Sequence, residues 1–126
     1  MTEQEAKAKC DAIRQIAYGL HVYLGVGYLE KVYENGLAHR LTKAGFCVQT
    51  QVPMQIHDED GYLLGDYVAD MVVDGIVVEL KAVSSLTNAH IAQAINYLVA
   101  MKIDHGMVIN FGSCKFESRK LVRPKS

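Results

Sequence analysis

Two carboxylates and a lysine are brought side by side by one short turn: Asp70, Glu79 and Lys81. The turn is Asp74-Gly75, a two-residue loop between β-branched runs, which is a strong hairpin signal because both turn residues need a positive φ. Counting outward from the turn places Asp70 directly opposite Glu79. Lys81 lies two residues after Glu79 and therefore on the same face of the strand. The pattern predicts a hairpin that carries an acidic pair beside a cation.

An acidic pair in such a hairpin has an energetic cost. Directly opposed side chains in an antiparallel pair have Cβ atoms about 4.5–5.5 Å apart, so like charges there are destabilising. The flanking residues are aliphatic on both faces, which predicts interior strands where an unpaired carboxylate costs several kcal/mol. A bound cation removes this cost, and oxygen ligands suit Mg²⁺ or Mn²⁺. The residues therefore point to metal-assisted phosphodiester hydrolysis.

A structural ion-pair cluster is the alternative interpretation of the same three residues. In that case Lys81 neutralises one acid, but a single lysine leaves net negative charge at a buried site, so we favour the cation site. A glycosidase is excluded because its two catalytic carboxyl groups must lie about 5 Å or more apart to flank a sugar. Directly opposed acids are too close together for this. The five histidines show neither HxxxH nor HxH spacing, so no zinc site is expected.

Length and charge limit the class of protein. The 126 residues suffice for one domain with a real core, and we expect a single domain over residues 1–126. Thirteen basic residues against 14 acidic ones give a formal net charge of −1, so the chain has no overall basic footprint for nucleic acid. Residues 115–125 are locally basic, and we expect them to form a solvated tail rather than a phosphate-binding segment.

Cysteine usage and hydropathy predict the compartment. Cys10, Cys47 and Cys114 are far apart and lack CxxC spacing, so we expect reduced core cysteines rather than disulfides or a zinc knuckle. The start of the chain is polar, and no stretch approaches the roughly 20 apolar residues of a membrane span. We therefore expect a soluble, cytoplasmic protein with no membrane partner.

Hydrophobic periodicity predicts the elements that must position the acidic pair. They are helices over 2–24 and 29–45, either as a pair or as one bent helix, strands over 46–57, 62–73 and 76–81, a helix over 86–102 and a strand over 106–111. Pro53 favours an edge position or a bulge in the first strand. A strand that leads through a helix into another strand favours a crossover. We expect an α/β fold in which helices flank a mixed sheet made of an antiparallel meander and a crossover strand.

This order of elements, with its acidic meander, resembles the PD-(D/E)XK nuclease superfamily, whose core is restriction-endonuclease-like. Ala69-Asp70 stands at the "PD" position and Glu79-Leu80-Lys81 at the "(D/E)XK" position. More narrowly, residues 27–33, GYLEKVY, match the GxxExxY signature of one small family of that superfamily. The resemblance extends over nearly the whole chain. Further matching segments are His21, Leu24-Gly25, Tyr67, Ala92-Gln93, Tyr97-Leu98 and Asn110-Phe111-Gly112.

The resemblance implies hydrolysis of DNA phosphodiester bonds by a metal-activated water, with Mg²⁺ or Mn²⁺ as cofactor. Asp70 and Glu79 would be metal ligands, and Glu30 would complete the acidic cluster. Lys81 would orient the attacking water or stabilise negative charge on the phosphate. Gln93 and Tyr97, four apart on one helix face, look like the QxxxY element of RecB-like nucleases, which supports the lysine and contacts the substrate.

Two positions depart from the pattern expected of this family. Val26 occupies the place where LGPG would have proline, and Val68 stands where an arginine often precedes Ala-Asp. Because Val68 is opposite Lys81 in the predicted hairpin, the missing positive charge would weaken phosphate binding. Glu34 lies one helical turn after Glu30 and competes with it for the site, and the resemblance favours Glu30.

The expected function is that of a Mg²⁺-dependent nuclease with nucleic acid as its partner, DNA rather than RNA. One alternative is a nuclease-fold protein that has lost efficient catalysis and acts as a nucleic-acid or protein binding module. Another is a metallohydrolase acting on a small phosphate ester, which would need a closed pocket. A homodimer would let so small a nuclease reach both strands of a duplex, although no residue demonstrates one.

Overall fold

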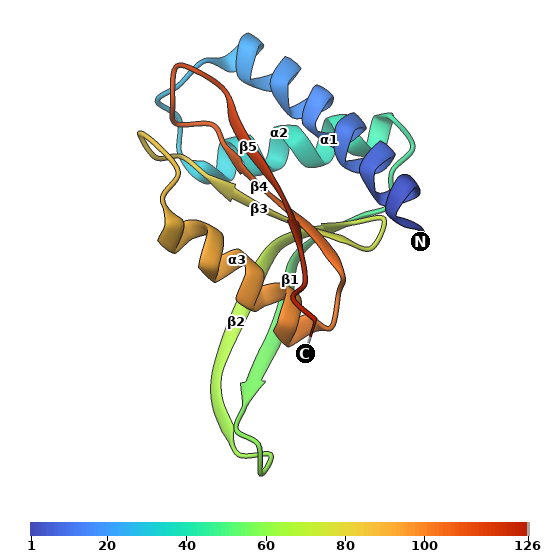
Figure 1. Ribbon diagram of the computed structural model, residues 1–126. Coiled ribbons are helices and arrows are strands. Elements are labelled where there is room, and N and C mark those ends of the chain that lie inside the picture. The colour runs from blue at the N-terminus through green and yellow to red at the C-terminus, as the bar shows by residue number, and fades with distance from the viewer. Residues whose placement is uncertain (126) are drawn as a thin grey trace.

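The computed structural model describes residues 1–125. It has a mixed five-stranded sheet with helices on both faces (Figure 1). The elements are α1 (Glu3–Leu24), α2 (Glu30–Lys43), β1 (Val48–His57), β2 (Leu63–Val73), β3 (Ile76–Lys81), α3 (Asn88–Met101), β4 (His105–Asn110) and β5 (Glu117–Val122). In space the strands run β1-β2-β3-β4-β5, with β3 and β4 parallel and the other neighbours antiparallel. The predicted α/β class, meander and crossover are confirmed, and β1 is the edge strand that Pro53 favours.

Local signals set the ends of the helices. The Thr2 side chain accepts a hydrogen bond from the Glu5 backbone N–H, and the Glu5 side chain accepts one from Thr2, which is a capping box at the start of α1. Gly25, with a φ of 71°, ends α1 and donates its backbone N–H to the His21 carbonyl. The first two helical patterns are therefore two separate helices.

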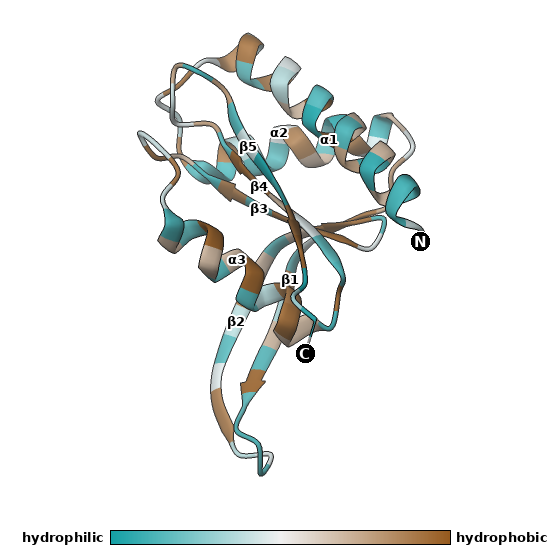
Figure 2. Ribbon diagram, in the orientation of Figure 1, coloured by the Kyte–Doolittle hydropathy of each residue, from teal (hydrophilic) through white to brown (hydrophobic). Residues whose placement is uncertain are grey.

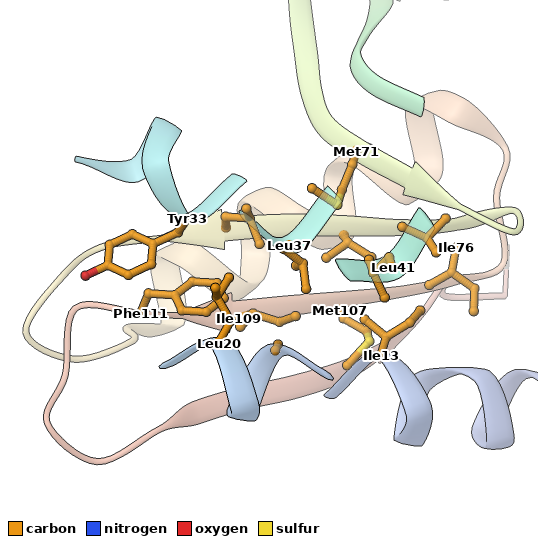
Figure 3. Close-up of a cluster of buried hydrophobic side chains, with 14 of the residues drawn as sticks. Ile13, Leu20, Tyr33, Leu37, Leu41, Met71, Ile76, Met107, Ile109 and Phe111 are labelled. Carbon is orange, nitrogen blue, oxygen red and sulfur yellow. The ribbon is translucent and has the colours of Figure 1, made fainter. Parts of the chain in front are cut away.

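The core has two layers, one on each face of the sheet. Between α1, α2 and the sheet lies the larger cluster, shown in Figure 3, which includes Ile13, Leu20, Tyr33, Leu37, Leu41, Met71, Ile76, Met107, Ile109 and Phe111. Beneath α3 lies a second cluster that includes Ala69, Val72, Val77, Tyr97, Leu98 and Val108. Strands β3 and β4 contribute to both clusters, which explains why their sequences are almost continuously apolar.

The β2–β3 turn has the conformation that its sequence predicts. Asp74 and Gly75 have φ values of 47° and 81°, and Val73 pairs with Ile76 as counted. The described antiparallel pairing nevertheless ends at the Met71–Val78 pair. The predicted backbone pairs beyond it, of Asp70 with Glu79 and of Val68 with Lys81, are therefore not part of this ladder, although the side chain of Glu79 still contacts Asp70.

The strands separate because the β1–β2 hairpin bends at this point. Ala69 belongs to the cluster under α3 and Met71 to the cluster under α1 and α2, although residues two apart normally share a face. Opposite them Gln51 has a φ of 53° and no partner in the described register, while its neighbours Thr50 and Val52 stay paired with Met71 and Ala69. This irregularity directs the hairpin away from the body of the molecule, below α3 in Figure 1.

The C-terminal segment and two cysteines differ from prediction. Residues 117–122 form β5 rather than a solvated tail, because Leu121 is buried and the backbone pairs with β4. The charged residues of this segment give no apolar pattern from which a strand could be predicted. Cys10 is a buried free thiol as expected, whereas Cys47 and Cys114 are exposed in segments outside the helices and strands. Within residues 1–125 no helix is long and apolar enough to cross a membrane.

A fully buried asparagine beside Lys81 joins the segment after β3 to the end of β4 and to β5 through side-chain hydrogen bonds. Asn110, at the end of β4, is paired with Lys81 in the parallel register. Its side-chain oxygen accepts hydrogen bonds from the backbone N–H groups of Val83 and Gly112, at 3.0 and 2.9 Å. Its side-chain nitrogen donates to the Val83 carbonyl and to Glu117 Oε1, both at 2.9 Å. These bonds fix the chain that leaves β3 against the β4–β5 end of the sheet.

We expect Asn110→Ala to lower the free energy of unfolding by about 3 kcal/mol, because several buried polar groups lose their partners. Urea denaturation followed by circular dichroism measures this change. Asn35→Ala, at an exposed position in α2, is the matched control and should change stability little. Equal midpoints for the two variants would show that the Asn110 bonds do not stabilise the fold.

Candidate active site

Crossed side-chain hydrogen bonds replace the backbone ladder where β2 leaves β3. The backbone N–H of Asp70 donates to Glu79 Oε1 at 3.0 Å, and the backbone N–H of Leu80 donates to Asp70 Oδ2 at 2.7 Å. Each carboxyl therefore binds the other strand's main chain. The two acids lie side by side although their backbones are unpaired, and Glu79 is only 5% exposed.

Burial and mutual repulsion make this pair hold a proton. Burial raises the pKa of Glu79 to about 8, and the charge of Asp70 adds to the rise. Burial also raises the pKa of Asp70, against the hydrogen bond from Leu80. A hydrogen bond between the two carboxyls lowers the pKa of Asp70 and raises that of Glu79. Glu79, whose pKa is the one raised to about 8, therefore keeps its proton at neutral pH.

The lysine of the site is held from the other side by α3. Lys81 Nζ donates to Gln93 Oε1 at 3.2 Å. The positive charge of Lys81 favours the ionised forms of Asp70, Glu79 and Glu30, although in each case the effect of burial is larger. The lysine is thus close enough to act electrostatically on the acidic pair.

The first two turns of α2 bring two further carboxylates, of Glu30 and Glu34, toward Asp70. Burial, and then the charge of Asp70, raises the pKa of Glu30, although the residue as a whole is exposed. Glu34 is only 4% exposed, and its charge contributes to the raised pKa of Asp70. Gln51 Nε2 donates to Glu34 Oε1 at 2.6 Å, and Lys31 binds its other oxygen. Glu30 and Glu34 therefore both interact electrostatically with Asp70. The side chain of Glu34 is fixed more firmly, because it has two hydrogen-bond partners.

Gln51 is the site residue that sequence reasoning missed. Its positive φ marks the bend opposite Asp70, and its side chain holds Glu34. A glutamine in a strand has no sequence signature for either property. Only glycine, asparagine or aspartate would have signalled a left-handed backbone there.

A cleft of about 770 Å³ opens between α3 and the outer part of the β1–β2 hairpin. Its lining is Gln55, Ile56, His57, Tyr67, Ala89, Ala92, Gln93, Asn96, Tyr97, Val99 and Ala100. The rings of Tyr67 and Tyr97 are 5.8 Å apart within it. Tyr97 is 9% exposed, and its pKa is raised mainly by burial. Gln93 and Tyr97 therefore share one face of α3, between the acidic pair and this cleft.

The donor set at the acidic pair fits one hard divalent cation. Within residues 1–125 no group of three or more His, Cys, Asp and Glu side chains could together hold a metal ion. The pair of Asp70 and Glu79 instead shares a proton in a buried setting, and a cation that displaced this proton would satisfy both carboxylates. Mg²⁺ is commonly bound through one or two carboxylates and keeps several waters. Two carboxylates are therefore enough.

Comparison with known proteins identifies the family. The model of the PD-(D/E)XK nuclease superfamily matches residues 7–122. No curated protein matches the chain. The crystal structure of SSO0001 is similar in fold, with a TM-score of 0.61 and 20% sequence identity over 76% of this chain. This chain spans about half the length of that protein, since the match covers 50% of it. Because the family match extends over most of the sequence, the chain belongs to the PD-(D/E)XK nuclease superfamily.

Proposed function

We propose that this protein is a nuclease that hydrolyses DNA with Mg²⁺ or Mn²⁺. The observation that carries the proposal is the buried pair of Asp70 and Glu79, which crossed hydrogen bonds hold side by side near Lys81. The superfamily membership supplies the reaction class, because nuclease chemistry is what its name describes. A buried acidic pair with a raised pKa is also the kind of perturbed group that is frequent at functional sites.

Each residue has a distinct part in the proposed reaction. Asp70 and Glu79 would hold the cation, and the hydrogen bond from Leu80 fixes the orientation of Asp70. A bound divalent cation would supply an activated water and neutralise charge on the phosphate. Lys81, positioned by Gln93, stabilises the negative charge that develops on the phosphate or orients the water.

Two residues complete the proposed site. Glu30, at the start of α2, adds negative charge toward Asp70 and so favours a cation. Tyr97 contacts the substrate from α3, next to Gln93. Glu34 supports the site from a buried position rather than by binding the ion, because its two oxygens are already taken by Gln51 and Lys31.

The finer assignment to the GxxExxY family is also a proposal, and the loop between α1 and α2 supports it. The Tyr33 hydroxyl donates to the Gly25 carbonyl at 2.6 Å and accepts from the Tyr28 backbone N–H at 3.3 Å. Gly27 has a φ of 109°, which suits glycine. The first and last residues of the signature thus shape the loop that delivers Glu30 to the start of α2.

The alternative of a binding module without catalysis loses one of its arguments. Val68 pairs with Pro53 of β1, and the described β2–β3 ladder ends before it, so the pairing with Lys81 on which this argument relied is not present. A single domain over residues 1–126, a cytoplasmic location and a homodimer stay predictions, and size-exclusion chromatography would decide the last.

We expect Mg²⁺-dependent cleavage of DNA by the wild-type protein and a loss of at least about 100-fold in Glu79→Gln and Lys81→Ala, because each removes transition-state stabilisation worth several kcal/mol. The assay compares supercoiled, linear and single-stranded DNA, with a nucleotide competitor to reveal a small phosphate ester as the true substrate. Asp11→Asn, an exposed carboxylate on α1, is the matched control and should cut as the wild type does. Cleavage that persists in both site variants would come from a contaminant and contradict the proposal.

The raised pKa of Glu79 also predicts how stability depends on pH. The folded protein holds this proton more tightly than the unfolded chain, since its pKa is about 8 against an ordinary value of 4.5. The stabilisation is complete below the unfolded pKa and is lost as pH rises through the folded one. In EDTA, the melting temperature of the wild type should therefore fall between about pH 5 and pH 8.

Two comparisons check this pH dependence. Glu79→Gln stays neutral at every pH and should flatten the decline in melting temperature. Mg²⁺ competes with the proton, so it should raise the wild-type melting temperature more at the alkaline end of the range. Parallel profiles for the wild type and Glu79→Gln would show that Glu79 does not carry the proton.

A further inference from the structure

We propose that the cleft between α3 and the β1–β2 hairpin binds an unpaired nucleobase next to the phosphate that is cut. The inference rests on the proposed nuclease function and narrows its substrate to single-stranded or frayed nucleic acid. The cleft is not part of the acidic pair, and its size of about 770 Å³ lies within the range of small-molecule pockets in proteins.

An exposed aromatic ring on the hairpin is the first feature that fits a base. Tyr67 of β2 is 48% exposed, and its ring lies 5.8 Å from that of the buried Tyr97 at an angle of 50°. Tyr97 thus packs beside Tyr67 in the wall of the cleft. A partly exposed ring in such a wall is a platform on which any base can stack, because every base has a π-face.

The rest of the lining combines uncharged amide side chains with aliphatic ones such as Ile56 and Val99. Gln55 of β1 and both Gln93 and Asn96 of α3 contribute amides, which donate and accept hydrogen bonds as base edges do. The described lining contains no Asp, Glu, Lys or Arg, and His57 is the one imidazole among its residues. Ala89 and Ala92 leave room between them on the helix. Such a lining suits a neutral heterocycle better than a phosphate.

Gln93 connects the cleft to the proposed catalytic lysine. The same side chain lines the cleft and accepts the hydrogen bond from Lys81 Nζ at 3.2 Å. A phosphate at Lys81 and a base in the cleft would therefore belong to neighbouring parts of one strand. A base that stays paired in a duplex keeps its faces in the stack and cannot lie on Tyr67. The geometry thus selects an unpaired strand.

Binding without cleavage tests the inference independently of catalysis. Fluorescence anisotropy in EDTA compares a short single strand, a hairpin duplex and a single strand with abasic residues. We expect the wild type to prefer the normal single strand over the other two. Tyr67→Ala and Ala92→Phe, which remove the platform and fill the cleft, should each weaken single-strand binding by about tenfold and leave duplex binding unchanged.

Two control variants separate stacking from damage to the fold. Tyr67→Phe keeps the ring and should retain the affinity, and Tyr62→Ala alters an exposed tyrosine outside the described cleft lining and should have no effect. Equal affinity for normal and abasic strands, or single-strand binding that survives Ala92→Phe, would overturn the inference.

The proposed nuclease function and this inference fail in different ways. Base-dependent binding in EDTA without any Mg²⁺-dependent cleavage would support the cleft and contradict the nuclease. Efficient cutting of duplex DNA that Ala92→Phe does not change would support the nuclease and contradict the cleft.

Discussion

The crossed hydrogen bonds between Asp70 and the Glu79-Leu80 segment are the interaction on which the site depends. They occupy the place where a backbone ladder would otherwise continue, so β2 can leave β3 without stranding buried N–H groups. The same contact brings two carboxyls together in a buried setting, where one of them keeps a proton. The same two hydrogen bonds therefore end the β2–β3 pairing and place the two carboxyls together.

The bend at Gln51 makes that exchange possible. A straight β1–β2 hairpin would keep β2 paired with β3 and would cover the free edge of β3 that presents Glu79 and Lys81. Because the hairpin changes faces at this point, its outer part lies beside α3 instead (Figure 1). Figure 2 shows hydrophobic residues near the start of β2, in this outer part, where Leu63 and Leu64 are exposed.

Periodicity and turn chemistry were sufficient to predict most of the fold. The Asp74-Gly75 turn, the helix cap at Thr2 and the apolar run of β3 are strong local signals, and each agrees with the structure. The register failed beyond Met71 because counting assumes an unbroken ladder, and nothing local announces the left-handed Gln51. Strand β5 was missed because its burial depends on β4 rather than on its own composition. The grouping of the acidic residues was foreseeable from the resemblance, but the raised pKa of Glu79 depends on burial and the role of Gln51 on a contact across the fold, and neither has a sequence signature.

The contacts that build the site share one further property, which is their short separation along the chain. The bonds from Asp70 and Leu80 span 9 and 10 residues, that from Lys81 to Gln93 spans 12, and that from Gln51 to Glu34 spans 17. Short loops close quickly and at low entropic cost. The Asn110 bonds to Val83 span 27 residues and join the later strands. The acidic site is thus encoded in a contiguous central stretch of chain, and its geometry can form during folding before the last two strands complete the sheet.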